Sequence, residues 1–224
     1  MDFDKYATSY DELLQRQHAF FSRDRSYFHR RKVQELLRVA PKRVGRVLDY
    51  GCGTGGAISE LRVAFPDADL VGCDPSAASL DAARKSCPGI RFVAPDALGD
   101  DRFDLIYMSC VMHHVPPHAW KSILGEVATL LSPNGVLAIF EHNPFNPVTR
   151  KLVRDCPFDA DAVLLSMTQL RGLFRESGLS AEDHGYFLFV PERIGWLGRL
   201  ERWITWLPLG GQYFVAGRVL KTTT

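Results

Sequence analysis

Short apolar runs alternate with longer amphipathic segments between residues 46 and 142 of the chain. The apolar runs predict strands, whereas the segments between them carry apolar residues at the three- and four-residue spacing of a helix. The predicted strands are 46–50, 69–74, 90–96, 103–110 and 135–142, and the predicted helices are 56–65, 76–86 and 118–131. Alternation at this interval predicts a parallel sheet with helices on both faces, so the expected fold class is α/β and doubly wound.

The two flanks follow a looser pattern. Residues 1–40 have helical spacing and predict one or two helices that end at Pro41. In the middle of the chain, the segment SPNG at 132–135 predicts a turn between a helix and a strand. Beyond residue 143 we expect an irregular insertion, a helix over 161–178 and strands at 180–190 and 212–221. With 224 residues the chain suits a single domain.

Composition and charge disfavour nucleic acid as the partner and a secreted or membrane-spanning protein. The formal net charge is +1, from 27 basic and 26 acidic residues, which lacks the basic surface of a nucleic-acid-binding protein. The five cysteines are scattered and odd in number, which favours free thiols in a reducing compartment over a disulfide framework. The N-terminus is polar and acidic, and no apolar run approaches the ~18 residues of a membrane span. We expect a cytoplasmic protein.

A glycine-rich turn follows the first predicted strand, in the segment LDYGCGTGG of residues 48–56. Gly51, Gly53 and Gly56 fit the dinucleotide pattern G-x-G-x-x-G, while Gly51, Gly53 and Gly55 fit a G-x-G-x-G variant typical of adenosine ligands. Both patterns let the backbone turn sharply and approach a ligand closely. The spacing alone therefore does not choose between the two ligands.

Three carboxylates close three successive predicted strands and favour one ligand. Asp49 would repel a pyrophosphate but would attract a cationic amino group, since ligands of open α/β sheets bind beyond these strand ends. Asp74 lies at the distance along the chain where an acidic residue accepts hydrogen bonds from ribose hydroxyls, and Asp96 is suited to accept one from an adenine amino group. Together they predict a ligand with an amino acid part, a ribose and a base.

Five segments in order resemble the motifs of class I S-adenosylmethionine-dependent methyltransferases: LDYGCGTGG, VGCDPS, PDAL, FDLIYMSCVMHHV and LLSPNGVLAIFEH. The resemblance covers roughly residues 1–145, and the last two predicted strands resemble the antiparallel hairpin of that family. It implies a mostly parallel seven-stranded sheet with an antiparallel C-terminal strand pair, and S-adenosyl-L-methionine as the cofactor. The cofactor-binding residues that it implies are Tyr10, Asp49, Gly51, Cys52, Gly53, Gly55, Asp74, Pro75, Asp96, Ala97, Met108 and Ser109.

The chain divides into three expected parts, of which the resemblance implies an N-terminal lid. Residues 1–40 would form an N-terminal helical lid with Tyr6 and Tyr10 over the cofactor, unless these tyrosines serve ordinary helix packing. Residues 41–145 would form the cofactor-binding core, and 146–224 a substrate-side insertion followed by the C-terminal strands. Within the Trp-rich segment 191–211, Leu197, Leu200, Trp203, Ile204 and Leu207 have helical spacing. This segment predicts a pocket cover, a dimer contact, a membrane contact through 194–207, or simple packing on the core.

Histidines supply the candidate catalytic residues. His113 and His114 follow the fourth predicted strand, and His142 beside Glu141 ends the fifth, so each would lie on the ligand side of the sheet. One of them would act as a general base or hydrogen-bond the acceptor, or they would only shape the loop; a base is needed only if the nucleophile arrives protonated. With His118 they suggest a metal site, but no carboxylate cluster or supporting partner accompanies them, so we expect no metal.

The combined prediction is a methyltransferase that acts on a small molecule at oxygen, nitrogen or carbon by in-line transfer. If the Trp-rich segment covers the pocket, the acceptor would be apolar or aromatic. Two alternatives stay open: a protein that binds S-adenosylmethionine as a regulatory or partner module without methyl transfer, and an NAD-dependent oxidoreductase.

Overall fold

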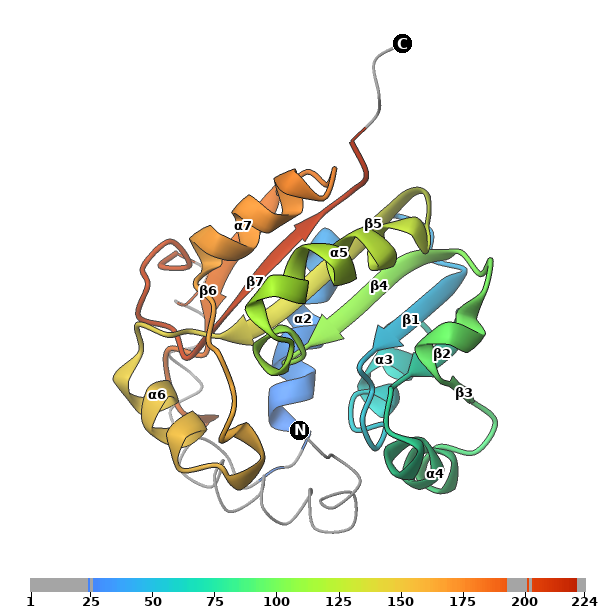
Figure 1. Ribbon diagram of the computed structural model, residues 1–224, viewed down its shortest axis with the longest axis horizontal. Helices are drawn as coiled ribbons and strands as arrows, with labels where there is room; N and C mark the ends of the chain where they lie inside the picture. The colour runs from blue at the N-terminus through green and yellow to red at the C-terminus, as the bar shows by residue number, and fades with distance from the viewer. Residues whose placement is uncertain (1–23, 25, 193–200, 202, 221–224) are drawn as a thin grey trace.

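A seven-stranded sheet with the order β3-β2-β1-β4-β5-β7-β6 forms the centre of the molecule (Figure 1). The structure is a computed structural model that describes residues 24, 26–192, 201 and 203–220. The strands are β1 Arg46–Tyr50, β2 Asp69–Cys73, β3 Arg91–Val93, β4 Phe103–Ser109, β5 Leu131–His142, β6 Asp183–Phe187 and β7 Gln212–Gly217. The first five are parallel, and β7 runs antiparallel to both β5 and β6. The predicted fold class and the antiparallel C-terminal pair are confirmed.

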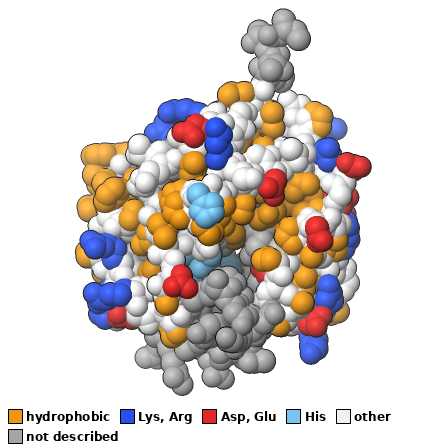
Figure 2. Space-filling view, in the orientation of Figure 1, with side chains coloured by type: hydrophobic (Ala, Val, Ile, Leu, Met, Phe, Trp, Pro, Cys, Tyr) orange, Lys and Arg blue, Asp and Glu red, His pale blue; other side chains and the backbone are white. Residues whose placement is uncertain are grey.

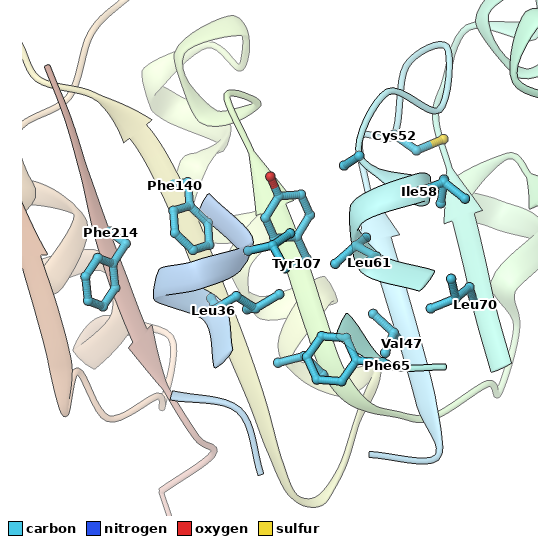
Figure 3. Packing of buried hydrophobic residues seen from close by; sticks show 14 of the residues in the cluster. Leu36, Val47, Cys52, Ile58, Leu61, Phe65, Leu70, Tyr107, Phe140 and Phe214 are labelled. Atoms are coloured by element: carbon cyan, nitrogen blue, oxygen red, sulfur yellow. The ribbon is translucent and has the colours of Figure 1, made fainter. Parts of the chain in front are cut away.

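Helices cover both faces of the sheet. The α-helices are α2 Tyr27–Val39, α3 Ile58–Ala64, α4 Ala77–Ser86, α5 Trp120–Thr129, α6 Pro147–Arg154 and α7 Met167–Glu176. Because side chains alternate along a strand, neighbours such as Val47 and Leu48 of β1 enter two separate hydrophobic clusters. In Figure 3, Leu36 of α2 lies beside the side chains of the first cluster, while α5 and α7 pack on the second.

Two predicted boundaries are wrong for local reasons. The helix expected over 161–178 begins only at Met167, because Ser166 forms a capping box with Gln169 that fixes the first turn. The turn expected at 132–135 belongs to β5 as an irregular stretch: Phe103 pairs with Leu131, but Leu105 pairs with Val136. The extra residues between these pairs bulge out of the ladder, and Asn134 adopts the left-handed conformation with φ 68°.

The Trp-rich segment lies only partly within the described residues. Residues 193–200 and 202 are outside them, and so are Tyr6 and Tyr10. The helical prediction is wrong for 203–207, where consecutive turns form instead, with Ile204 N–H donating to Glu201 O and Leu207 N–H to Ile204 O. Within the described ranges, no helix combines the length and apolar character needed to cross a bilayer.

Candidate active site

The sheet order reverses between β1 and β4, and the loops that follow these two strands meet there. Such a reversal point is where open α/β sheets bind their ligands, beyond the carboxyl ends of the strands. Gly51, at φ 77°, approaches the β4 loop so closely that a Cβ on it would lie 2.3 Å from Cγ2 of Val111. Glycine is therefore required at this contact between the two loops.

Asp74 holds the glycine-rich loop to the end of β2. Its Oδ2 accepts a hydrogen bond from Gly53 N–H at 2.9 Å, and its Oδ1 accepts one from Ser76 N–H at 2.9 Å. Gly53 has φ 51°, and a Cβ placed on it would meet no atom within 4 Å. The loop thus uses a glycine where the protein itself leaves open space, which is the expected geometry of a cradle for a ligand.

We expect Gly53→Ala to weaken binding of S-adenosylhomocysteine by at least about tenfold, because the added methyl group would occupy that space. The backbone strain at positive φ will lower the free energy of unfolding by only about 1–2 kcal/mol. Gly89→Ala is the matched control, since Gly89 also has positive φ and open space but follows α4, away from this loop. Calorimetric titration and urea unfolding of both variants check this; equal affinities in the two variants would contradict the cradle.

Asp49 is a buried carboxylate without a partner for one of its oxygens. Its side chain lies at the end of β1 with 3% exposure, and Oδ2 has no hydrogen-bond partner among the described residues. Burial and then the charge of Asp74 raise the pKa of Asp49 to about 7, against the opposing effect of Lys32. A bound ammonium group would satisfy this oxygen, so the residues present fit the amino acid end of S-adenosylmethionine.

A pH dependence of ligand binding follows from the raised pKa of Asp49. Below pH 7 the carboxyl group is protonated in the free protein, and a cationic ligand must displace that proton. We therefore expect the dissociation constant of S-adenosylhomocysteine to rise by about tenfold for each pH unit below 7 and to level off above it. Titrations across this pH range test the expectation, with Asp49→Asn as the variant in which the slope should vanish. A slope that persists in Asp49→Asn would assign it to another group.

The other predicted cofactor residues have varied environments. Asp96 and Ala97 are exposed in a short 3-10 turn, Pro95–Leu98, and Pro75 is exposed beside Asp74. Gly55, at φ 84°, lets the loop contact α4, since its Cβ would lie 3.3 Å from the sulfur of Cys87. Cys52 and Met108 are buried in the two hydrophobic clusters, and Ser109 is half-buried at the end of β4. Tyr10 is outside the described residues.

His113 lies between two carboxylates. Its Nδ1 is 2.6 Å from Glu141 Oε2, and its Nε2 is 3.6 Å from Asp159 Oδ1. Glu141 Oε1 also accepts hydrogen bonds from the N–H groups of Val111 and Met112, so the network joins the β4 loop, the end of β5 and the insertion. Burial alone would lower the pKa of His113, but the two carboxylates outweigh it and raise this pKa to about 10.

This environment gives the two neighbouring histidines opposite protonation states at neutral pH. His113 is an imidazolium and has no free site for another proton, which suits a positioning role better than that of a base. Burial and then the charge of His113 lower the pKa of His114 to about 4, so His114 is neutral. His114 Nε2 lies 3.5 Å from Asp159 Oδ1. His142, whose ring centroid is 5.1 Å from that of His113, is half-buried.

Asp159 adds to the histidines the carboxylate that was lacking when the sequence predicted no metal site. Potential ligand atoms of His113, His114 and Asp159 lie within 4.8 Å of one another, a spacing that a metal ion can bridge. In the protein as described, however, Glu141 and Asp159 are both partners of one imidazolium, and a metal would have to displace its proton. Nothing in the sequence signalled Asp159, which is separated from the two histidines by α5, β5 and α6.

A second polar cluster surrounds Lys32 on the buried side of α2. Its Nζ donates to Ser109 Oγ at 2.6 Å and lies 3.3 Å from Cys110 Sγ. Lys32 is 4% exposed, and it forms no ion pair with any described carboxylate. Sequence reasoning missed Lys32, although its spacing from Leu36 places a lysine in the apolar stripe of this helix.

Cys110 and Gln212 complete this cluster. Cys110 has φ 57°; burial raises its pKa, but the charges of Lys32 and then His142 outweigh it and lower the pKa to about 6. Gln212 Nε2 lies 3.8 Å from Cys110 Sγ and 3.5 Å from His142 Nδ1. Its Oε1 is buried and has no hydrogen-bond partner among the described residues. The ends of β4, β5 and β7 thus enclose a polar cluster around the ammonium of Lys32.

Comparison with known proteins identifies the family. A family model described as a methyltransferase domain matches residues 21–184. The chain belongs to this methyltransferase family. Solved structures agree with the fold: an S-adenosylmethionine-dependent methyltransferase from Archaeoglobus fulgidus has a TM-score of 0.66 at 17% identity, with 92% of this chain and 99% of that one covered. A structure described as a possible histamine N-methyltransferase from Thermotoga maritima has a TM-score of 0.67 at 19% identity, covering 97% and 98%.

Curated relatives of this methyltransferase have a higher sequence identity than these structures, over part of the chain. A trans-aconitate 2-methyltransferase from Methylobacterium radiotolerans is 35% identical over 128 residues, which are 55% of this chain and 48% of the relative. The enzyme of that name from Variovorax paradoxus is 38% identical over 129 residues, 55% of this chain and 49% of the relative. The chain spans about half the length of the curated relatives it matches. The predicted class I membership, and S-adenosylmethionine as the cofactor of the class, are confirmed.

Proposed function

We propose that this methyltransferase transfers the methyl group of S-adenosylmethionine to a small acceptor that carries a carboxylate. The observation behind the proposal is the buried ammonium of Lys32, which has hydroxyl and thiol neighbours at Ser109 and Cys110 but no ion pair with a described carboxylate. The Cys110 thiolate balances part of this buried charge, and the carboxylate of an anionic acceptor would add a stronger partner at the same ammonium. This choice replaces the apolar or aromatic acceptor expected from the Trp-rich segment.

The curated relatives support the same class of acceptor. Their names give trans-aconitate, an acid, as the molecule that they methylate. Turns replace the predicted helix at 203–207, and residues 193–200 and 202 lie outside the described residues, so the Trp-rich segment gives no support to an apolar acceptor here. A carboxylate is ionised at neutral pH, so it needs no general base to become a nucleophile.

In this proposal the chain's own residues bind the cofactor, orient the acceptor and exclude water from the site. The glycine-rich loop and Asp74 hold the nucleoside, and Asp49 holds the amino acid end. S-adenosylmethionine, when bound, supplies a methyl group on a sulfonium whose departure leaves a neutral thioether. Lys32 orients the acceptor carboxylate, while His114 and His142 contribute hydrogen bonds to the acceptor. His113, fixed by Glu141 and Asp159, positions the loop that carries His114.

Incubation with S-adenosylmethionine labelled at its methyl group tests the proposal. We expect label to appear in methyl esters of small di- and tricarboxylates, trans-aconitate among them, and not in phenols or neutral alcohols of similar size. Label in the neutral panel alone would overturn the acceptor class. Binding of S-adenosylhomocysteine without transfer to any acceptor would favour the alternative of a binding module.

A further inference from the structure

Five apolar side chains are exposed on one edge of the molecule, and we call them the Trp face. Its members are Trp203 at 69% exposure, Trp206 at 73%, Leu209 at 63%, Phe145 at 63% and Val148 at 39%. Large aromatic side chains are seldom so exposed on a protein without a partner for that surface. Figure 2 shows hydrophobic side chains gathered at the upper left, where the turns before β7 lie in Figure 1.

Hydrogen bonds join the two segments that carry the Trp face. The side-chain amide of Asn146, the N-cap of α6, donates to Leu209 O at 2.7 Å. The side-chain amide of Asn143 donates to Pro208 O at 3.0 Å and to Gly210 O at 2.7 Å. The turns 203–209 are therefore fixed against the start of α6, and the exposed side chains of both segments form one surface.

Basic side chains border this surface along α6. Thr149 and Val153 of this helix are buried, and its outer side carries Arg150, Lys151 and Arg154 in exposed positions. Among the described carboxylates, Asp155 alone pairs with these cations, at Lys151 and Arg154. In Figure 2 basic side chains lie below the apolar group on the same edge, where α6 is drawn in Figure 1. Apolar and aromatic groups beside an excess of cations match the interface of a bilayer with anionic lipids.

We infer that the Trp face, with the basic side of α6, docks on the surface of an anionic lipid membrane. The tryptophans enter the headgroup region, and the cations contact lipid phosphates. This surface lies next to the candidate active site, because α6 follows the end of β5 and the turns 203–209 lead into β7. Docking of this kind would bring the site close to the bilayer, and it does not depend on which acceptor is methylated.

Cosedimentation and tryptophan fluorescence with vesicles test the inference. We expect the protein to bind vesicles of phosphatidylcholine mixed with phosphatidylglycerol, with a blue shift of tryptophan emission, and to bind pure phosphatidylcholine at least about tenfold more weakly. Trp203→Ser with Trp206→Ser should abolish the blue shift, and Arg150→Gln with Arg154→Gln should weaken binding to the anionic vesicles by about tenfold. All four side chains are exposed, so these variants should fold.

Matched controls are Val63→Ser, which removes another exposed apolar side chain, and Lys121→Gln with Arg102→Gln, which remove exposed charges elsewhere. Both should bind as the parent protein does. Failure to bind either kind of vesicle would overturn the inference, and so would binding that the tryptophan variants leave unchanged. Self-association without vesicles that the tryptophan variants abolish would assign the face to a second copy of the chain instead.

Discussion

Replacing Lys32 by Met will raise the KM for a carboxylate acceptor by roughly 100-fold, while the affinity for S-adenosylhomocysteine at pH 7 will fall by less than about tenfold, because Lys32 also opposes the rise in the pKa of Asp49. The ammonium of Lys32 is buried at the end of β4, where its loss leaves an acceptor carboxylate without its countercharge. Methionine has a similar length and fills the space beside Leu36 without a charge, so the helix should pack as before. Steady-state kinetics with several acids, and calorimetric titration with S-adenosylhomocysteine, measure the two effects separately.

A spectroscopic readout distinguishes this role of Lys32 from a purely structural one. Lys32 is the largest of the charges that lower the pKa of Cys110 to about 6. In the Lys32→Met variant the thiolate absorbance of Cys110 should therefore appear only at higher pH. Lys121→Met, which removes an exposed lysine, should change neither the KM nor this titration. A KM that stays constant in Lys32→Met, with the thiol titration shifted, would contradict the proposed carboxylate contact.

Glu141→Gln will lower the free energy of unfolding by about 3–5 kcal/mol, the usual cost of removing one partner from a buried ion network. Glu141 is fully buried and accepts from Val111 N–H, Met112 N–H and the imidazolium of His113. The glutamine amide carries no charge, and its NH2 group would face one of the N–H donors that the carboxylate accepts from. Urea unfolding at pH 7 measures the loss, with Glu126→Gln, an exposed carboxylate of α5, as the control. A change below about 1 kcal/mol would contradict the ion network.

The pH dependence of this stability has a definite sign. The pKa of His113 is raised from 6.5 to about 10, so its contribution is complete below pH 6.5 and is lost as pH rises through 10. The pKa values of Glu141 and Asp159 are lowered, so their contribution is complete above their ordinary values of 4.5 and 3.8 and is lost in acid. The difference in unfolding free energy between the parent and Glu141→Gln should thus be largest near pH 5–6.5 and shrink toward pH 10. A difference in unfolding free energy that grows above pH 7 would contradict the raised pKa of His113.

The sheet and the glycine-rich loop could be predicted from sequence because their signals are local. The run RVLDY alternates its side chains between two cores, and the glycines after it stand at the positions where positive φ or close approach requires them. The start of α7 could also have been predicted, since Ser166 and Gln169 form a capping box. The strand residues at 132–135 could not be predicted in this way. SPNG has the composition of a turn, and only the pairing of β5 with β4 places it in the sheet.

The polar side of the site could not be predicted, because distant segments assemble it. Lys32 comes from α2, Gln212 from β7 and Asp159 from the insertion, and no spacing rule links them to His113. The sequence named His113 and His114 together as candidate bases, yet only the two carboxylates around His113 give the neighbours opposite protonation states. The proposed carboxylate acceptor rests on Lys32, which the sequence did not single out, whereas the Trp-rich segment suggested an apolar molecule.

Calorimetric titration tests most directly whether the carboxylates at the strand ends hold this cofactor. S-adenosylhomocysteine is titrated into the parent protein and into its Asp74→Ala variant, and NADH is titrated into the parent protein in parallel. Asp74 carries both the glycine-rich loop and the predicted ribose contact. We expect one molecule bound per chain, a loss of roughly 1–3 kcal/mol of binding free energy in Asp74→Ala, and no heat from NADH. Binding of NADH without S-adenosylhomocysteine, or an affinity for S-adenosylhomocysteine that Asp74→Ala leaves unchanged, would contradict it.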